Sequence, residues 1–266
     1  LTETDITSLF MAGLVPGLLL GALYMVAAWL VVLMRPEMGR PAEKLPMRER
    51  LASLRGTWGV LVLFLAVLGG MYFGVFTPTE GAGVGAAGAF LFMVLRGKAS
   101  LEIVRGALLE AARTTAALLL VMAAAMVFNN FLTIAGLTGA LLEWVQSLQV
   151  SPLGVIAAIC LIYIVLGCVF DSLAAMFLTV PVFFPVIVGL GIDPIWFGVL
   201  VVMVVELGLI TPPVGMNVFI VKALAPQVGL WRVYAGVTPY IVANVLCLLL
   251  VIAFPAIALL LPGWMK

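Results

Sequence analysis

Long apolar runs separated by short polar breaks occupy most of the chain. The runs cover residues 11–34, 58–76, 81–95, 114–134, 153–169, 172–189, 192–225 and 239–261. Because a spanning helix takes roughly 20 apolar residues, this pattern predicts about six to eight membrane-embedded segments. The predicted fold class is therefore an all-α polytopic membrane protein, in which helices bond the backbone polar groups that lipid cannot.

The polar segments between these runs indicate how the chain is oriented. A basic loop covers residues 35–57, and two amphipathic segments, 100–113 and 226–235, are too polar to span but have an apolar face. A further short interfacial helix is expected over residues 136–149. All Lys and Arg residues except Lys266 fall on one side of the alternating topology, which the positive-inside rule makes cytoplasmic.

Composition removes several classes of function. Apolar residues make up 65% of the chain and charged residues 9%, against about 25% charged in a soluble domain. A net charge of +1 provides no basic surface, so nucleic acid is excluded as a partner. The chain has no His, which excludes His-containing zinc sites, His proton relays and Ser-His nucleophiles. The three Cys lie in apolar runs, where they behave as small hydrophobes.

A double proline interrupts the apolar stretch 192–225. Since proline lacks an N–H, Pro212 and Pro213 are expected to remove the helical partners of the carbonyls of Gly208 and Leu209. Backbone that opens at membrane depth is buried in protein or lines a wet cavity. In secondary transporters such breaks hold the coupling cation and face an anionic substrate. The alternative is a proline kink that affects packing only.

The flanking residues favour the binding interpretation. Gly208 and Gly215 allow close approach to the opened backbone, and Thr211 and Asn217 add oxygen ligands of the kind that sodium prefers. We therefore predict a sodium site at this break.

Two acids lie in otherwise apolar segments, Asp171 at the tip between two apolar arms and Glu206 just before the break. An intramembrane acid costs at least about 2.5 kcal/mol, so a functional role is the first hypothesis. A helix cap is the alternative for Asp171, and a structural hydrogen bond is the alternative for Glu206. The segment Thr77-Pro-Thr-Glu80, in contrast, has the spacing of a capping box.

The order of these features resembles the large membrane subunit of the tripartite ATP-independent periplasmic (TRAP) transporters, the dicarboxylate-type permeases. The resemblance rests on motifs spread over essentially the whole chain. These motifs are Phe10-Met-Ala-Gly-Leu-Val-Pro-Gly17, Gly74-Val-Phe-Thr-Pro-Thr-Glu80, Asp171-Ser-Leu-Ala-Ala175, Gly191-Ile-Asp-Pro194 and Glu206-Leu-Gly-Leu-Ile-Thr-Pro-Pro-Val-Gly-Met-Asn217.

The resemblance implies the second half of an inverted-repeat, elevator-type transporter with a re-entrant hairpin and a discontinuous helix. Its sodium site would combine the 167–172 tip with residues 208–215. The cation-binding candidates are Gly167, Asp171, Ser172, Gly208, Thr211 and Gly215. The substrate-binding candidates are Thr211, Pro212, Pro213 and Asn217, and Glu206 is a possible coupling acid.

The same resemblance implies partners and a location. The chain would act with a small TRAP membrane subunit and a periplasmic substrate-binding protein, importing a small organic acid such as a dicarboxylate through the lipid bilayer. We expect a multi-pass protein of the bacterial inner membrane, with sodium as coupling ion, no other cofactor and no enzymatic activity.

The predicted domains follow from this assignment. Residues 1–113 would be scaffold-type helices with the basic loop and the first interfacial arm. Residues 114–225 would form the transport-type core, with a hairpin over 153–189 and a broken helix over 192–225. Residues 226–266 would supply the second arm and the last spanning helix. The tip between the hairpin arms carries no Lys or Arg, which favours a re-entrant hairpin over two full crossings.

Alternative interpretations remain open from the sequence. Family chains are longer, so this chain is expected to be the C-terminal part of a permease, or else a non-transporting half-permease fragment. A proton-coupled or binding-protein-independent carboxylate transporter of related fold could use Asp171 or Glu206 as proton carrier. An intramembrane hydrolase would need an unusual dyad of these two acids.

Overall fold

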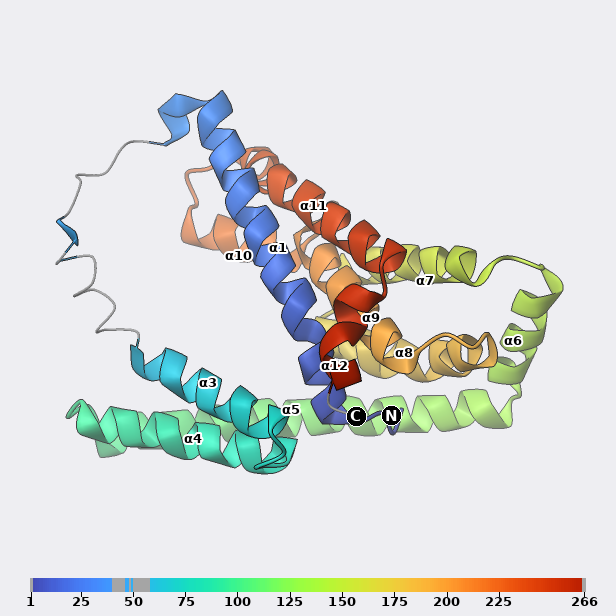
Figure 1. Cartoon of the computed structure of the whole chain (residues 1–266), viewed down its shortest axis with the longest axis horizontal. Coiled ribbons are helices and arrows are strands. Elements are labelled where there is room, and N and C mark those ends of the chain that lie inside the picture. Colours follow the sequence, from blue (N-terminus) through green and yellow to red (C-terminus); the bar gives the residue numbers. More distant parts are fainter. Residues whose placement is uncertain (1, 40–45, 48, 50–57, 265–266) are drawn as a thin grey trace. The chain divides into compact units, whose positions relative to one another are not determined.

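The computed structural model describes residues 2–39, 46, 47, 49 and 58–264, and the regular structure in these residues is helical (Figure 1). The helices are α1 (Ile6–Met34), the short 3-10 helix η1 (Pro36–Met38), α3 (Trp58–Tyr72), α4 (Pro78–Leu95), α5 (Leu101–Ile134), α6 (Leu137–Ser147), α7 (Pro152–Gly167), α8 (Ser172–Gly189), α9 (Pro194–Ile210), α10 (Met216–Leu224), α11 (Leu230–Ala253) and α12 (Ala256–Trp264). Most of the predicted basic loop lies outside the described residues.

Five of the described helices, α1, α4, α5, α8 and α11, are long and apolar enough to cross a membrane. The shorter helices α3, α7 and α9 are also apolar. The helical architecture and these candidate spans agree with the predicted polytopic membrane protein. The predicted division into scaffold-type helices, a transport-type core and a second arm stays a prediction, because the positions of the helices alone do not test it.

The chain forms two compact units, residues 1–36 with 117–266, and residues 37–116. In the smaller unit α3 packs against α4, with Trp58 edge-on to Phe92. The predicted capping box at the start of α4 is confirmed. The Glu80 amide donates to Thr77 Oγ1 (3.4 Å), and the Thr77 amide donates to Glu80 Oε2 (2.8 Å).

Helix α9 forms the centre of the larger unit. It contacts α1, α7, α8, α10, α11 and α12, and Figure 1 shows it between these helices. Most of its side chains are buried, with Val204, Val205, Leu200 and Leu207 almost fully enclosed. Because α9 is apolar on all sides except at Glu206, its sequence suits a helix packed among several others.

The structure joins two pairs of segments that the sequence analysis separated. The predicted arm 100–113 and the span after it form one helix, α5, of 34 residues. Residues 107–134 contain no Gly or Pro, so nothing in them ends a helix. Similarly, part of the second predicted arm is the beginning of α11, and the last predicted span is interrupted at Phe254 and Pro255, before α12.

Two prolines, one inside α8 and one just after α11, leave carbonyls without a helical partner, and distant side chains bond these carbonyls. Pro181 cannot donate to Phe177 O, which accepts from Asn129 Nδ2 of α5 at 3.3 Å. Pro255 cannot donate to Val251 O, which accepts from Trp196 Nε1 of α9 at 3.0 Å. Both bonds replace a missing helical bond in a region where lipid offers none.

The tightest backbone approach in the core joins α7 to α9. A β carbon placed on Gly208 would lie 2.7 Å from the Cα of Gly167 and 3.0 Å from Ile164 O. A β carbon on Gly167 would lie 3.0 Å from Val205 O. These atoms belong to backbone, which cannot swing aside, so the crossing requires glycine on both helices.

We expect Trp196→Phe to lower the free energy of unfolding by about 1–3 kcal/mol, because it leaves the buried Val251 carbonyl without its donor. Thermal unfolding in detergent measures the effect. Trp144→Phe is the matched control, since Trp144 is 59% exposed. Equal shifts for the two variants would contradict the role of the bond.

We expect Gly208→Ala to destabilise the larger unit by roughly 3 kcal/mol or more, because the new methyl group overlaps the backbone of α7. Gly236→Ala in α11 is the control, since its β carbon meets nothing within 4 Å. Unfolding temperatures of the two variants give the comparison. A Gly208→Ala protein as stable as the control would show that the close approach does not form.

Candidate functional site

Residues 211–215 separate α9 from α10, so the structure opens the helix where the sequence predicted (Figure 1). One detail of that prediction is wrong. Gly208 O keeps a partner, because the Thr211 amide turns back and donates to it at 3.1 Å. The helical partner of Leu209 O would be the amide of residue 213, which is a proline and has no N–H to give. The break therefore exposes fewer helical carbonyls than expected at its N-terminal side.

The tip between α7 and α8 touches this break directly. The Gly215 amide donates to Cys168 O at 3.2 Å, and Cys168 Sγ donates to Pro212 O at 3.5 Å. Together with the contact between Gly167 and Gly208, these bonds join residues between 41 and 47 positions apart. The structure thus brings the predicted tip and break segments together.

Gly215 begins α10 in a left-handed conformation, with φ +58°. A β carbon there would lie 3.0 Å from Thr211 O, so both the conformation and the space favour glycine. No side chain caps this helix end. The amide groups in the first turn of α10 therefore form a partially positive end next to the tip.

The remaining predicted residues occupy different positions around this junction. Asp171 is exposed and caps α8, since its carboxylate accepts from the Leu173 amide at 3.1 Å. Its geometry matches the capping alternative. Ser172 is half-buried at the first position of α8, and Thr211 Oγ1 donates to Leu207 O at 2.6 Å. Pro212, Pro213 and Asn217 are exposed.

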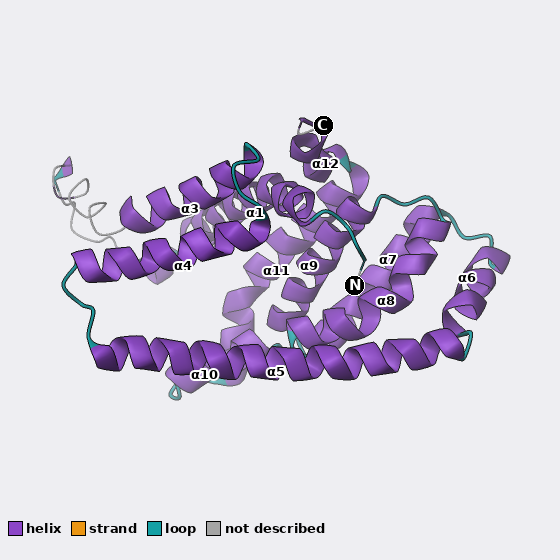
Figure 2. Cartoon of the chain, turned by 90° about the horizontal axis from the view of Figure 1, so that it is seen from below, coloured by secondary structure: helices purple, strands orange, loops and turns teal. Residues whose placement is uncertain are grey.

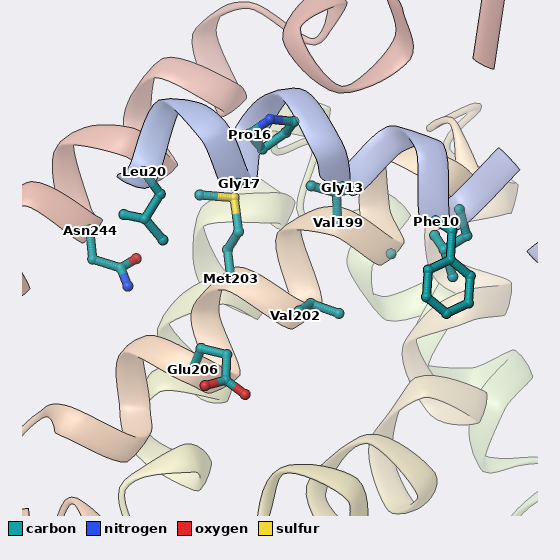
Figure 3. Close-up of a pocket in the computed structure, with 12 residues that line it drawn as sticks. Phe10, Gly13, Pro16, Gly17, Leu20, Val199, Val202, Met203, Glu206 and Asn244 are labelled. Atoms are coloured by element: carbon teal, nitrogen blue, oxygen red, sulfur yellow. The ribbon is translucent and has the colours of Figure 1, made fainter. Parts of the chain in front are cut away.

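Glu206 lies on a different face of α9 from the tip. Figure 3 shows it on the same side as Val199, Val202 and Met203, and these residues line an apolar cavity of about 410 Å³ with parts of α1 and Asn244 of α11. Asn244 is 2% exposed and donates to Tyr24 OH at 3.2 Å. Its Oδ1 atom has no hydrogen-bond partner. The structure therefore does not bring Glu206 to the predicted cation site.

Sequence analysis missed two residues that hold the break. Cys168 bonds the break from the tip. Because Cys168 follows Gly167, a predicted cation-site residue, the sequence could have suggested this bond. Tyr234 bonds it from α11, with its hydroxyl oxygen 2.9 Å from Pro213 O and 2.7 Å from Val214 O. Nothing in the sequence marks Tyr234, because the contact arises from the packing of α11 against α10.

The chemistry of this junction suits a hard cation better than a transition metal. The oxygens that surround it are backbone carbonyls and hydroxyls, the ligands with which opened helices bind sodium. Within the described part of the chain, no group of three or more His, Cys, Asp or Glu could hold a metal ion. Asp171 and Glu206 come from separate places, the tip and the far face of α9, so they form no acidic dyad.

Comparison with known proteins identifies the family. Residues 1–257 match the model of the tripartite ATP-independent periplasmic transporter, DctM component. The chain is 36% identical to the C4-dicarboxylate TRAP transporter large permease protein DctM of Pseudomonas aeruginosa, over 99% of this chain and 61% of that protein.

Other relatives carry different substrate names. The sialic acid TRAP transporter large permease protein SiaM of Vibrio cholerae is 33% identical over 98% of this chain and 61% of that protein. The ectoine TRAP transporter large permease protein TeaC of Halomonas elongata is 33% identical over 98% and 61%. The chain thus spans about three-fifths of the length of these relatives, which are transporter permeases rather than enzymes. These matches confirm the resemblance found in the sequence: the chain belongs to the DctM family, the large permease component of TRAP transporters.

Proposed function

We propose that this chain forms the cation-binding half of a sodium-coupled permease that imports a small organic acid across the bacterial inner membrane. The permease would work with a small TRAP membrane subunit and a periplasmic substrate-binding protein. The observation that carries the proposal is the junction of the 168–171 tip with the 211–215 break, held by Gly167 against Gly208 and by the bond from Gly215 to Cys168.

The helix ends at this junction favour ions of both signs. Helices α7 and α9 both end here, and their C-terminal carbonyls give a partially negative region that attracts a cation. Helices α8 and α10 both begin here, and their N-terminal amides attract an anion. Asp171 already caps α8, whereas α10 has no side-chain cap. We therefore place the sodium ion near the ends of α7 and α9 and the carboxylate near the beginning of α10.

The length of α7 supports a re-entrant hairpin. Its 16 residues rise about 24 Å at 1.5 Å per residue, which is less than the hydrocarbon thickness of about 30 Å. Helices α7 and α8 pack together, as Figure 2 shows, with only residues 168–171 between them. We propose that they enter and leave on the same side and that this hairpin moves with α9 and α10 in an elevator-type step.

The substrate class is inferred from the names of the relatives. The named relatives handle C4-dicarboxylates, sialic acid and ectoine. A dicarboxylate is the first candidate for this chain, because the relative at 36% identity carries that name. The exposed Pro212, Pro213 and Asn217 beside the α10 amides would contact it.

Proton coupling is the second candidate, and one observation favours it. Glu206 is an acid inside an apolar helix, and it is exposed at the wall of a largely apolar cavity. A permease that carries protons on Glu206 would need neither the tip nor the break for coupling. A binding-protein-independent transporter and a non-transporting fragment remain further alternatives.

Uptake by the complete permease in proteoliposomes should require sodium outside and should not follow a pH gradient.

Asp171→Asn keeps a good capping residue but removes a charge at the tip. We expect this change to raise the sodium concentration for half-maximal uptake roughly fivefold, as a ~1 kcal/mol charge effect near a helix end gives. Full uptake should return at saturating sodium. Uptake that responds to pH and ignores sodium would refute the proposal.

Glu206→Gln separates the two coupling candidates. Because Glu206 lies on the face of α9 away from the tip, we expect the sodium dependence of uptake to stay within about twofold of wild type. Val202→Ala, on the same cavity wall, controls for packing. If Glu206→Gln abolishes concentrative uptake while Val202→Ala does not, proton transfer through Glu206 is the better account.

A further inference from the structure

Tyr234 ties the opened segment between α9 and α10 to α11. Its side chain is 7% exposed and packs with Val218 of α10 and Val233 of α11. Its hydroxyl oxygen lies 2.9 Å from Pro213 O and 2.7 Å from Val214 O. These two consecutive carbonyls are part of the break, where the helix no longer fixes their direction.

A phenol has one proton, so Tyr234 donates to only one of the two carbonyls at a time. Each carbonyl oxygen has two lone pairs, and the bond from Tyr234 uses at most one of them. Both oxygens therefore keep a lone pair for another positive group. The hydroxyl fixes the direction of the carbonyls without occupying them fully.

Two parts of the chain bond the break, the tip between α7 and α8 and helix α11. The tip bonds it through Cys168, whose carbonyl accepts from Gly215 and whose thiol donates to Pro212. Helix α11 bonds it through Tyr234. Helix α10 is held to α11 independently of the hydroxyl, because Val218 packs with Val233 and with the Tyr234 side chain. Lys222 Nζ also bonds the loop that follows α10, donating to Pro226 O at 2.7 Å and to Val228 O at 2.6 Å. Loss of the Tyr234 hydroxyl would thus free the carbonyls without detaching α10.

We infer that Tyr234 is a positioning residue that orients the carbonyls of Pro213 and Val214 for the coupling cation. This inference rests on the proposed sodium coupling and adds a residue from α11 to it. Tyr234 acts through the two carbonyls and does not itself touch the ion. Preorganised ligands bind more tightly because less ordering is needed when the ion arrives.

The test is Tyr234→Phe in the complete permease, with Tyr240→Phe as matched control. Tyr240 lies on the same helix, and its ring packs edge-on to Tyr24. Its hydroxyl makes no hydrogen bond to the described residues. The unfolding temperature is measured in detergent as sodium is titrated, since an ion that binds only the folded protein raises that temperature.

We expect Tyr234→Phe to need about tenfold more sodium for the same rise in unfolding temperature, the loss typical of one hydrogen bond. The KM for substrate at saturating sodium should change less than about twofold. Tyr240→Phe should titrate like wild type. 4-Aminophenylalanine at position 234 restores an N–H donor, so it should return the sodium response toward wild type. This variant is used in place of Tyr234→Phe if the Phe variant does not fold.

A sodium titration of Tyr234→Phe that matches wild type, or shows tighter binding, would overturn the inference alone. A variant that loses stability equally at all sodium concentrations would also overturn it, because Tyr234 would then act on the fold. A wild-type permease that does not respond to sodium would instead refute the sodium coupling on which the inference rests.

Discussion

The contact between Gly167 and Gly208 is the constraint on which the rest of the site depends. It lets α7 approach α9 so closely that Cys168, the residue after Gly167, can accept a hydrogen bond from the Gly215 amide across the junction. With any side chain at either position, the tip would stand away from the break and the four helix ends would no longer meet. The burial of α9 by its neighbours fixes one side of this contact, and the short length of the tip fixes the other.

Prolines distinguish the break from the rest of the apolar core. The carbonyls freed by Pro181 and Pro255 are bonded by side chains of other helices, Asn129 and Trp196. Helix α8 continues through Pro181, whereas α11 ends at Ala253, just before Pro255. At the break the chain instead satisfies its carbonyls with groups that are themselves part of the junction, the Thr211 amide, the Cys168 thiol and the Tyr234 hydroxyl. An opened backbone with mobile or shared partners is suited to exchange one of them for an ion.

The sequence predicted features that depend on local chemistry. The double proline predicted the break, and the residues around Thr77 predicted the capping box, because both effects act within one helical turn. The continuity of α5 was missed, since polarity changes along it while helix propensity does not. The partner of Gly208 O and the contact of Tyr234 were also missed, because they depend on how the chain turns back and how α11 packs against α10.

The helical period of α9 separates two candidate sites that the sequence places side by side. Val205 and Gly208 are three residues apart and face α7, whereas Val202 and Glu206 are four apart and face the cavity beside α1. The two faces of α9 thus have different surroundings. The face toward α7 meets carbonyls and helix ends, and the face toward the cavity meets apolar side chains and Asn244. An ion bound at the junction would still act on Glu206 electrostatically across α9, because charges interact through space and do so strongly at low dielectric constant. The proposed sodium coupling and the alternative of a proton on Glu206 thus draw on different groups of this chain, so a substitution at one site leaves the packing contacts of the other in place.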